Sequence, residues 1–188
     1  TALLSPQSDM LRTSLQAHLT GVPLTAWHHG TWRLVSVPCV GHTPTMITLM
    51  CGHSTEKPPD VEPANLSPET QDAIALTASL ASRKWGGHFV CWHWSGKNDI
   101  SGASLGLPVF LGFGCAAEGV PMPRALATGK LDATGAIEPV ENVENKATLA
   151  GDRGFFIPEA NASGTMTACI PVGHVDDAWD LWKSCASG

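Results

Sequence analysis

The chain has 188 residues, of which 43% are hydrophobic and 15% charged, a composition typical of one globular domain. No apolar run reaches the roughly 18 residues that a membrane-spanning helix needs, so we expect no membrane association. The formal net charge is -6 and the 11 Lys and Arg residues are scattered, which argues against a nucleic-acid partner.

The first residues predict a lead-in segment before the domain proper. Ser5-Pro6 can cap a short helix that Gly21 ends. The apolar residues of this helix recur at a spacing of four and are Leu11, Leu15 and Leu19. We therefore divide the chain into a lead-in of residues 1–22 and one domain of residues 23–188.

Cysteine usage indicates a reducing compartment. The N-terminal stretch lacks the basic and apolar regions of a secretory signal, and the cysteines form no C-x-x-C pair. The six cysteines are Cys39, Cys51, Cys91, Cys115, Cys169 and Cys185. This pattern fits reduced core thiols better than a disulfide framework, so we expect a cytoplasmic location.

The first half of the domain predicts paired strands followed by a helix and a third strand. Trp32–Val37 and Thr45–Met50 are rich in residues that favour strands. Ser67 is a good N-cap before a proline, and a helix over residues 68–84 follows, with an apolar stripe and a closing Gly-Gly. His88–Trp94 predicts a strand that is covered on both faces.

The second half alternates helices and strands. Ser104 is expected to open a helix through Glu118, closed by Gly119. Strands over residues 124–131 and 136–140 flank a turn-forming Asp-Ala-Thr-Gly sequence. The remaining elements are expected as a helix at 141–150, strands at 154–157 and 165–171, and a helix at 176–183. The fold class is therefore α/β in the α+β sense, a single compact domain of mixed sheets with packed helices.

One lysine lies where an apolar residue is expected. Val143, Lys146, Ala147 and Ala150 share one face of the predicted helix because they lie three and four residues apart. Burial disfavours the ammonium form and lowers a lysine pKa. A general base near neutral pH needs a drop of about 3 from the usual value near 10.4. Lys146 is therefore a candidate general base.

Two hydroxyl groups complete the candidate chemistry. A serine attacks a carbonyl only if a neighbouring group takes its proton, and a neutral lysine can be that group. Ser104 precedes a predicted helix, so nearby backbone N–H groups, those of Ser104 and Ala103, are candidates for holding an oxyanion. Thr128, at the end of a predicted strand, has a hydroxyl that could orient the amine of Lys146.

Four stretches together resemble the proteolytic domain of Lon proteases. They are Asp99–Pro108, Ala127–Val140, Asn145–Ala147 and Gly154–Pro158, in the same order and at similar spacing. The resemblance covers residues from about 89 to 161. The stretch before residue 71 carries little of it.

The resemblance implies a serine endopeptidase that cleaves peptide bonds through an acyl-enzyme. Ser104 is then the nucleophile, Lys146 the general base and Thr128 a supporting hydroxyl. Members of the family often carry an acidic residue three positions before the serine and another after the Thr-Gly pair. This chain has Ser101 and Lys130 there. How the lysine is held is therefore open, and Lys130 could supply a competing charge.

The resemblance also implies partners. Family members act on polypeptides and usually form hexameric rings driven by an ATPase module. This chain has no G-x-x-x-x-G-K-[ST] phosphate loop. We therefore expect no cofactor in this chain, with ATP and Mg²⁺ needed only if an unfoldase module lies elsewhere, and a possible homo-oligomeric ring.

Two other chemistries remain as alternatives. Gly102–Gly106 also fits a nucleophile elbow, and Asp152 and His174 follow in the order of an α/β-hydrolase-type esterase, although a polar stretch precedes the serine where a strand is needed. Cys51–His53 and Cys91–His93 offer metal ligands, but neither has zinc-site spacing, and we expect no metal site.

The last alternative is a catalytically silent oligomerisation or binding module of the same fold. Seven Trp residues raise the question of a partner-facing patch, because Trp179 and Trp182 lie three apart on the last predicted helix. Core packing is the favoured use of these two rings.

Overall fold

The computed structural model describes residues 30–40, 44–57, 66–93, 102–162 and 169–186. The predicted lead-in helix and the start of the strand predicted at 165–171 lie outside these residues. Within them, the chain has the mixed α/β content that the sequence predicts. None of the described helices combines the length and the apolar character needed to cross a bilayer.

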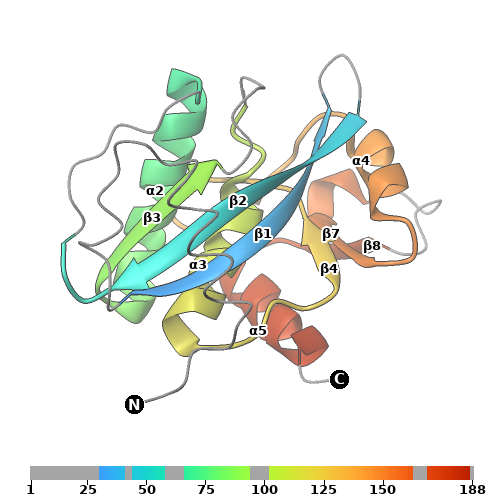
Figure 1. Ribbon diagram of the computed structural model, residues 1–188. Helices are drawn as coiled ribbons and strands as arrows, with labels where there is room; N and C mark the ends of the chain where they lie inside the picture. The colour runs from blue at the N-terminus through green and yellow to red at the C-terminus, as the bar shows by residue number, and fades with distance from the viewer. Residues whose placement is uncertain (1–29, 41–43, 58–65, 94–101, 163–168, 187–188) are drawn as a thin grey trace.

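The first sheet forms the front of the molecule in Figure 1. Among the described residues it contains three antiparallel strands in the order β1 (Thr31–Val40), β2 (Pro44–Ser54) and β3 (His88–His93). The predicted strand pair is confirmed and extends further at both ends. The sheet is buried on the side that carries Val35 and Leu49, which face the helices behind it.

Helix α2 (Pro68–Trp85) begins and ends as its sequence predicts. The Ser67 hydroxyl accepts a hydrogen bond from the backbone N–H of Thr70 at 3.2 Å. Because this bond satisfies one of the free donors of the first turn, Ser67 fixes the start of the helix. Gly86, with φ of +71°, ends it.

Helix α3 (Gly106–Glu118) lies behind β1 and β2 and is buried along most of its length (Figure 1). The prediction that Ser104 opens this helix is wrong, because the helix begins at Gly106 with Leu105 as its N-cap. An N-cap carbonyl accepts the N–H four residues on, and four residues after Ser104 is Pro108, which has no N–H. The first such bond runs instead from Val109 N–H to the Leu105 carbonyl, at 3.1 Å.

The second half of the chain forms a parallel sheet and a hairpin. Within the described ranges the sheet order is β4 (Ala125–Ala127), β7 (Gly154–Pro158) and β8 (Cys169–Val172), and the hairpin joins β5 (Lys130–Leu131) to β6 (Ile137–Glu138). The remaining elements are α4 (Val143–Ala150), a 3-10 turn η2 (Glu159–Asn161) and α5 (Val175–Ala186).

The strand predicted over residues 124–131 is interrupted. Thr128 and Gly129 separate β4 from β5 because their backbone groups bind other parts of the chain. Thr128 N–H bonds to the Phe156 carbonyl at 3.0 Å, and Gly129 N–H bonds to the Ser104 carbonyl at 2.9 Å. This interruption brings the turn before α3 against the end of β4.

Two hydrophobic clusters hold these elements together. The larger one joins the first sheet, α2, α3 and α5, and it contains Trp179 and Trp182, each 1% exposed. The predicted use of these two tryptophans in core packing is therefore confirmed. The smaller cluster packs α4 on β7 through Val143, Phe155 and Ile157, among others.

Candidate active site

Thr128 lies at the centre of the candidate site. Its side chain is fully buried at the carboxyl end of β4. The Thr128 hydroxyl accepts a hydrogen bond from Lys146 Nζ at 3.2 Å and donates one to the Ser104 carbonyl at 3.3 Å. One hydroxyl therefore joins the candidate base to the backbone of the candidate nucleophile.

Lys146 extends from the buried face of α4. Its side chain is 5% exposed, and Val143 and Ala150 are buried on the same face, as the spacing predicts. Burial lowers the pKa of Lys146 below the ordinary value of 10.5, and the nearby Cys39 and Glu141 oppose that shift in part. The amine can therefore lose its proton more readily than a lysine in water.

Ser104 is half-buried in the turn that leads into α3. Its carbonyl is held twice, by the Thr128 hydroxyl and by Gly129 N–H at 2.9 Å. Across the part of the chain that the structure describes, no hydrogen bond joins the Ser104 hydroxyl directly to Lys146. The structure thus brings the three predicted residues together through Thr128, whereas the sequence predicts direct contact between hydroxyl and amine.

The turn around Ser104 also carries hydrogen-bond donors. The Ala103 carbonyl accepts the N–H of Gly106 at 3.2 Å, which closes the turn. No described residue accepts the backbone N–H of Ala103 or Ser104. These two groups are the donors that the sequence singles out for an oxyanion.

Two residues that hold this site are not apparent from the sequence. The Thr70 hydroxyl, at the start of α2, donates to the Gly102 carbonyl at 3.2 Å and so anchors the turn before Ser104. Asn161 binds Val140 with its side-chain amide, shortly before α4. Each bond links residues more than 20 positions apart, and no local sequence pattern encodes such a pair.

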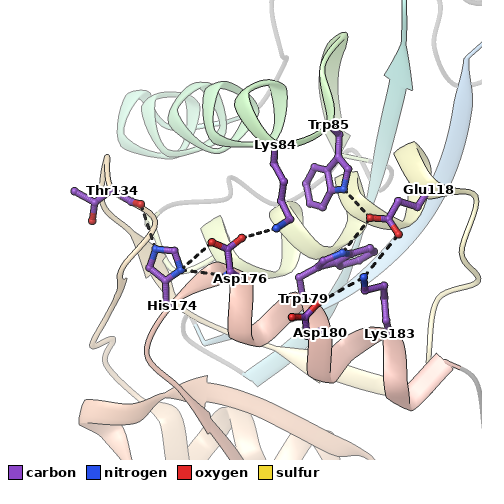
Figure 2. A network of polar contacts seen from close by, with 9 residues as sticks. All are labelled: Lys84, Trp85, Glu118, Thr134, His174, Asp176, Trp179, Asp180 and Lys183. Carbon is purple, nitrogen blue, oxygen red and sulfur yellow. Dashed lines mark hydrogen bonds and ion pairs between the residues drawn. The ribbon is translucent and has the colours of Figure 1, made fainter.

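The residues of the esterase alternative bind elsewhere. The Asp152 carboxylate pairs with Arg124 at 3.1 Å, and both side chains are exposed. Figure 2 shows His174 between the Thr134 carbonyl and Asp176, at 3.3 Å and 3.4 Å. Neither residue bonds to Ser104, so the described residues contain no assembled Ser-His-Asp triad.

The polar network of Figure 2 joins α5 to the neighbouring helices. Lys84 of α2 pairs with Asp176, and Glu118 at the end of α3 accepts the indole N–H groups of Trp85 and Trp179 at 2.9 Å and 3.2 Å. These contacts satisfy polar atoms at the edge of the core. Their arrangement indicates a structural role.

The cysteines of the two candidate metal motifs face each other inside the first sheet. Cys51 and Cys91 are buried at opposed positions of β2 and β3, with their sulfur atoms 4.0 Å apart. Within the described ranges, no group of three or more His, Cys, Asp or Glu side chains is placed to hold a metal ion. Buried opposed thiols of this kind act as small apolar side chains.

Lys130, the residue with a potentially competing charge, points away from the core. Its side chain is half-exposed and its Nζ lies 2.7 Å from Glu138 on the neighbouring strand of the hairpin. This ion pair raises the pKa of Lys130. The charge of Lys130 is thus paired at the surface.

The chain matches no protein-family model and no curated protein.

Burial of the Lys146 amine predicts a pH-dependent stability effect. Lys146→Met removes a charge that the folded state disfavours, so at neutral pH we expect a higher free energy of unfolding, by on the order of 1 kcal/mol. Because the native pKa is lowered, wild-type stability rises with pH between that value and the unfolded value of 10.5. The difference in the free energy of unfolding between Lys146→Met and wild type should therefore decrease over this alkaline range. Urea unfolding at several pH values measures this difference.

Lys130→Met is the matched control for that experiment. Because Glu138 raises the pKa of Lys130, this lysine contributes stability at neutral pH that is lost as pH rises through its own pKa. The control should be slightly less stable than wild type at neutral pH. A Lys146→Met advantage that stays constant up to about pH 10 would contradict the account of a lowered lysine pKa.

Proposed function

We propose that the protein is a serine-type peptidase in which Ser104 is the nucleophile and Lys146 the general base. The observation that carries the proposal is the buried Lys146 amine, bound to a threonine hydroxyl that also holds the Ser104 backbone. A lysine among apolar side chains normally extends its charge to water, but this one does not. Lysine bases in enzymes are activated by such burial.

The reaction follows from these groups. Neutral Lys146 takes the proton of the Ser104 hydroxyl as its oxygen attacks the scissile carbonyl carbon. The resulting ammonium gives that proton to the leaving nitrogen when the C–N bond breaks, which leaves an acyl-enzyme. Lys146 then takes a proton from water, which attacks the ester, and the proton returns to the Ser104 oxygen as the acid product leaves.

The proposal requires the Ser104 hydroxyl and the amine to meet during the reaction. Catalytic hydrogen bonds are often long or absent without substrate and form in the substrate complex. The Ser104 hydroxyl is a short side chain on a backbone already tied to the same threonine as the amine. A rotation of the serine side chain is the motion by which we expect the two groups to approach.

The N–H groups of Ala103 and Ser104 are our candidates for the oxyanion hole. Both precede the start of α3, where the helix dipole favours negative charge. Donors fixed in place before the reaction stabilise the charge that develops on the carbonyl oxygen. The bond between Gly106 N–H and the Ala103 carbonyl supports this fixed geometry.

The motif order that resembles Lon proteases is a second, independent support. On this basis we propose polypeptide substrates, a ring of identical subunits, and an ATP-driven unfoldase on the same or another chain. The chain's own residues require no cofactor for the proposed steps. All six cysteines are free, in keeping with a cytoplasmic location.

One observation favours a second candidate, the catalytically silent binding module. The Lys146 amine is already bound to Thr128, and no direct bond to the Ser104 hydroxyl exists among the described residues. A domain that had lost activity could keep Lys146 and Thr128 as a buried structural pair.

Trapping of the acyl-enzyme separates these two functions. The protein is mixed with a short peptide ester, quenched in acid, digested and mapped by mass spectrometry. A peptidase should carry the acyl group on Ser104, and neither Ser104→Ala nor heat-denatured protein should carry it in that peptide. Peptide turnover without an adduct at Ser104 would overturn the assignment of the nucleophile. No turnover and no adduct would favour the binding module.

A further inference from the structure

The side-chain amide of Asn161 forms hydrogen bonds with the backbone of one residue before α4, Val140. Asn161 Oδ1 accepts the N–H of Val140 at 2.8 Å, and Nδ2 donates to the Val140 carbonyl at 3.0 Å. Both polar groups of one peptide residue are thus held by one side chain. Asn161 itself ends the turn that follows β7.

Helix α4 depends on such contacts for its position. It has eight residues, and its N-cap, Asn142, has φ of +58° and no side-chain capping bond. A helix this short is unstable alone and is held by tertiary packing. Val143 and Ala150 fix which face packs on β7. Val140, which Asn161 binds, lies three residues before the helix. These bonds therefore fix the position of the first turn of α4 along β7.

Strand β7 and its following turn position both partners of the Lys146–Thr128 hydrogen bond. Thr128 is held by its backbone N–H, which bonds to the Phe156 carbonyl at 3.0 Å. Lys146 is held by α4, whose start is tied to Asn161, five residues after Phe156. A shift of α4 relative to β7 therefore changes the distance between Lys146 Nζ and Thr128 Oγ1 directly.

We propose that Asn161 is a positioning residue for Lys146. Its bonds to Val140 set the first turn of α4 so that the Lys146 amine reaches Thr128 inside the core. Asn161 touches no reacting atom in this role. The catalytic consequence rests on the proposed peptidase function, whereas the placement of the amine does not.

The test compares Asn161→Ala and Asn161→Asp with wild type. Alanine removes both hydrogen bonds to Val140. Aspartate can still accept the N–H of Val140 but cannot donate to the Val140 carbonyl. Without these bonds the Lys146 amine should move toward water, so the pKa of Lys146 should rise toward 10.5. The rise should be larger in Asn161→Ala than in Asn161→Asp. Reductive methylation with ¹³C-formaldehyde and NMR titration of the methylated lysines measures this pKa without any substrate. Glu159→Ala, at an exposed position of the same turn, is the matched control and should leave that pKa unchanged.

Peptide hydrolysis supplies the second readout. We expect kcat to fall about tenfold in Asn161→Ala with KM nearly unchanged, and the acid limb of the pH–kcat profile to move to higher pH. Lower thermal stability with an unmoved Lys146 pKa would overturn the proposal and leave Asn161 a purely structural residue. A raised pKa in a protein that hydrolyses no peptide would keep the positioning role and reject the peptidase function. If Asn161→Ala does not fold, the aspartate variant alone decides, because an unchanged pKa there contradicts the role of the donated bond.

Discussion

Ser104→Ala and Lys146→Met are each expected to lower kcat/KM for peptide hydrolysis by about 10³-fold or more. The first variant removes the attacking oxygen, and the second removes the group that takes its proton. Methionine fills much of the volume of the buried lysine, which is 5% exposed, so the fold should persist. Turnover of fluorogenic peptides or casein measures the effect, with circular dichroism to verify folding.

The double variant sharpens this result. A nucleophile and its base act as one unit, so removing both should cost no more activity than removing one. If the two losses multiplied instead, Lys146 would be acting on some step that does not involve Ser104. The effect of Lys146→Met would then reflect binding or stability, and a different base would have to be sought.

Two further variants distinguish the proposed dyad from its rivals. His174→Ala should retain activity, because this side chain contacts Thr134 and Asp176 and makes no bond to Ser104. Lys130→Met should retain it as well, since Lys130 is paired with Glu138 at the surface. Loss of activity in His174→Ala, with Lys146→Met active, would favour the esterase arrangement.

Local signals in the sequence predict the elements whose ends are set by neighbouring residues. Ser67 caps α2, and Gly86 ends it, because each acts on backbone groups within a few positions. The buried face of α4 also follows from local spacing, and this places Lys146 in the core. The strand pair β1 and β2 follows from composition and an intervening turn.

Bonds between distant residues set the remaining features. The strand predicted through residue 131 breaks at Thr128 because Phe156 and Ser104 bind the backbone there. Pro108 has no N–H, and this local signal predicts that the helix starts after Ser104. Because no helical N–H binds the Ser104 carbonyl, that carbonyl can accept the Thr128 hydroxyl instead. No local signal in the sequence predicts the hydrogen bonds between Asn161 and Val140, since the two residues are joined only when β7 and α4 meet.

Thr128→Val is expected to lower kcat by about 100-fold and to change KM little. Valine keeps the shape of threonine but removes the acceptor for Lys146 Nζ and the donor to the Ser104 carbonyl. The amine, still buried, is then left without its partner, at a stability cost of about 1–3 kcal/mol. Steady-state kinetics and urea unfolding measure the two effects.

Thr128→Ser is the informative partner of that variant, because serine keeps the hydroxyl and loses only a methyl group. Its activity should stay within about tenfold of wild type, since both hydrogen bonds can re-form, while its stability falls by about 1 kcal/mol through the lost methyl group. Comparison of the two variants therefore separates the effect of the hydrogen bonds of the hydroxyl from the effect of packing of the methyl group. A kcat that falls in Thr128→Ser but not in Thr128→Val would mean that the methyl group, and not the hydroxyl, matters. Wild-type kcat in Thr128→Val would show that Lys146 and Ser104 need no hydroxyl between them, which would remove the structural link on which the peptidase assignment depends.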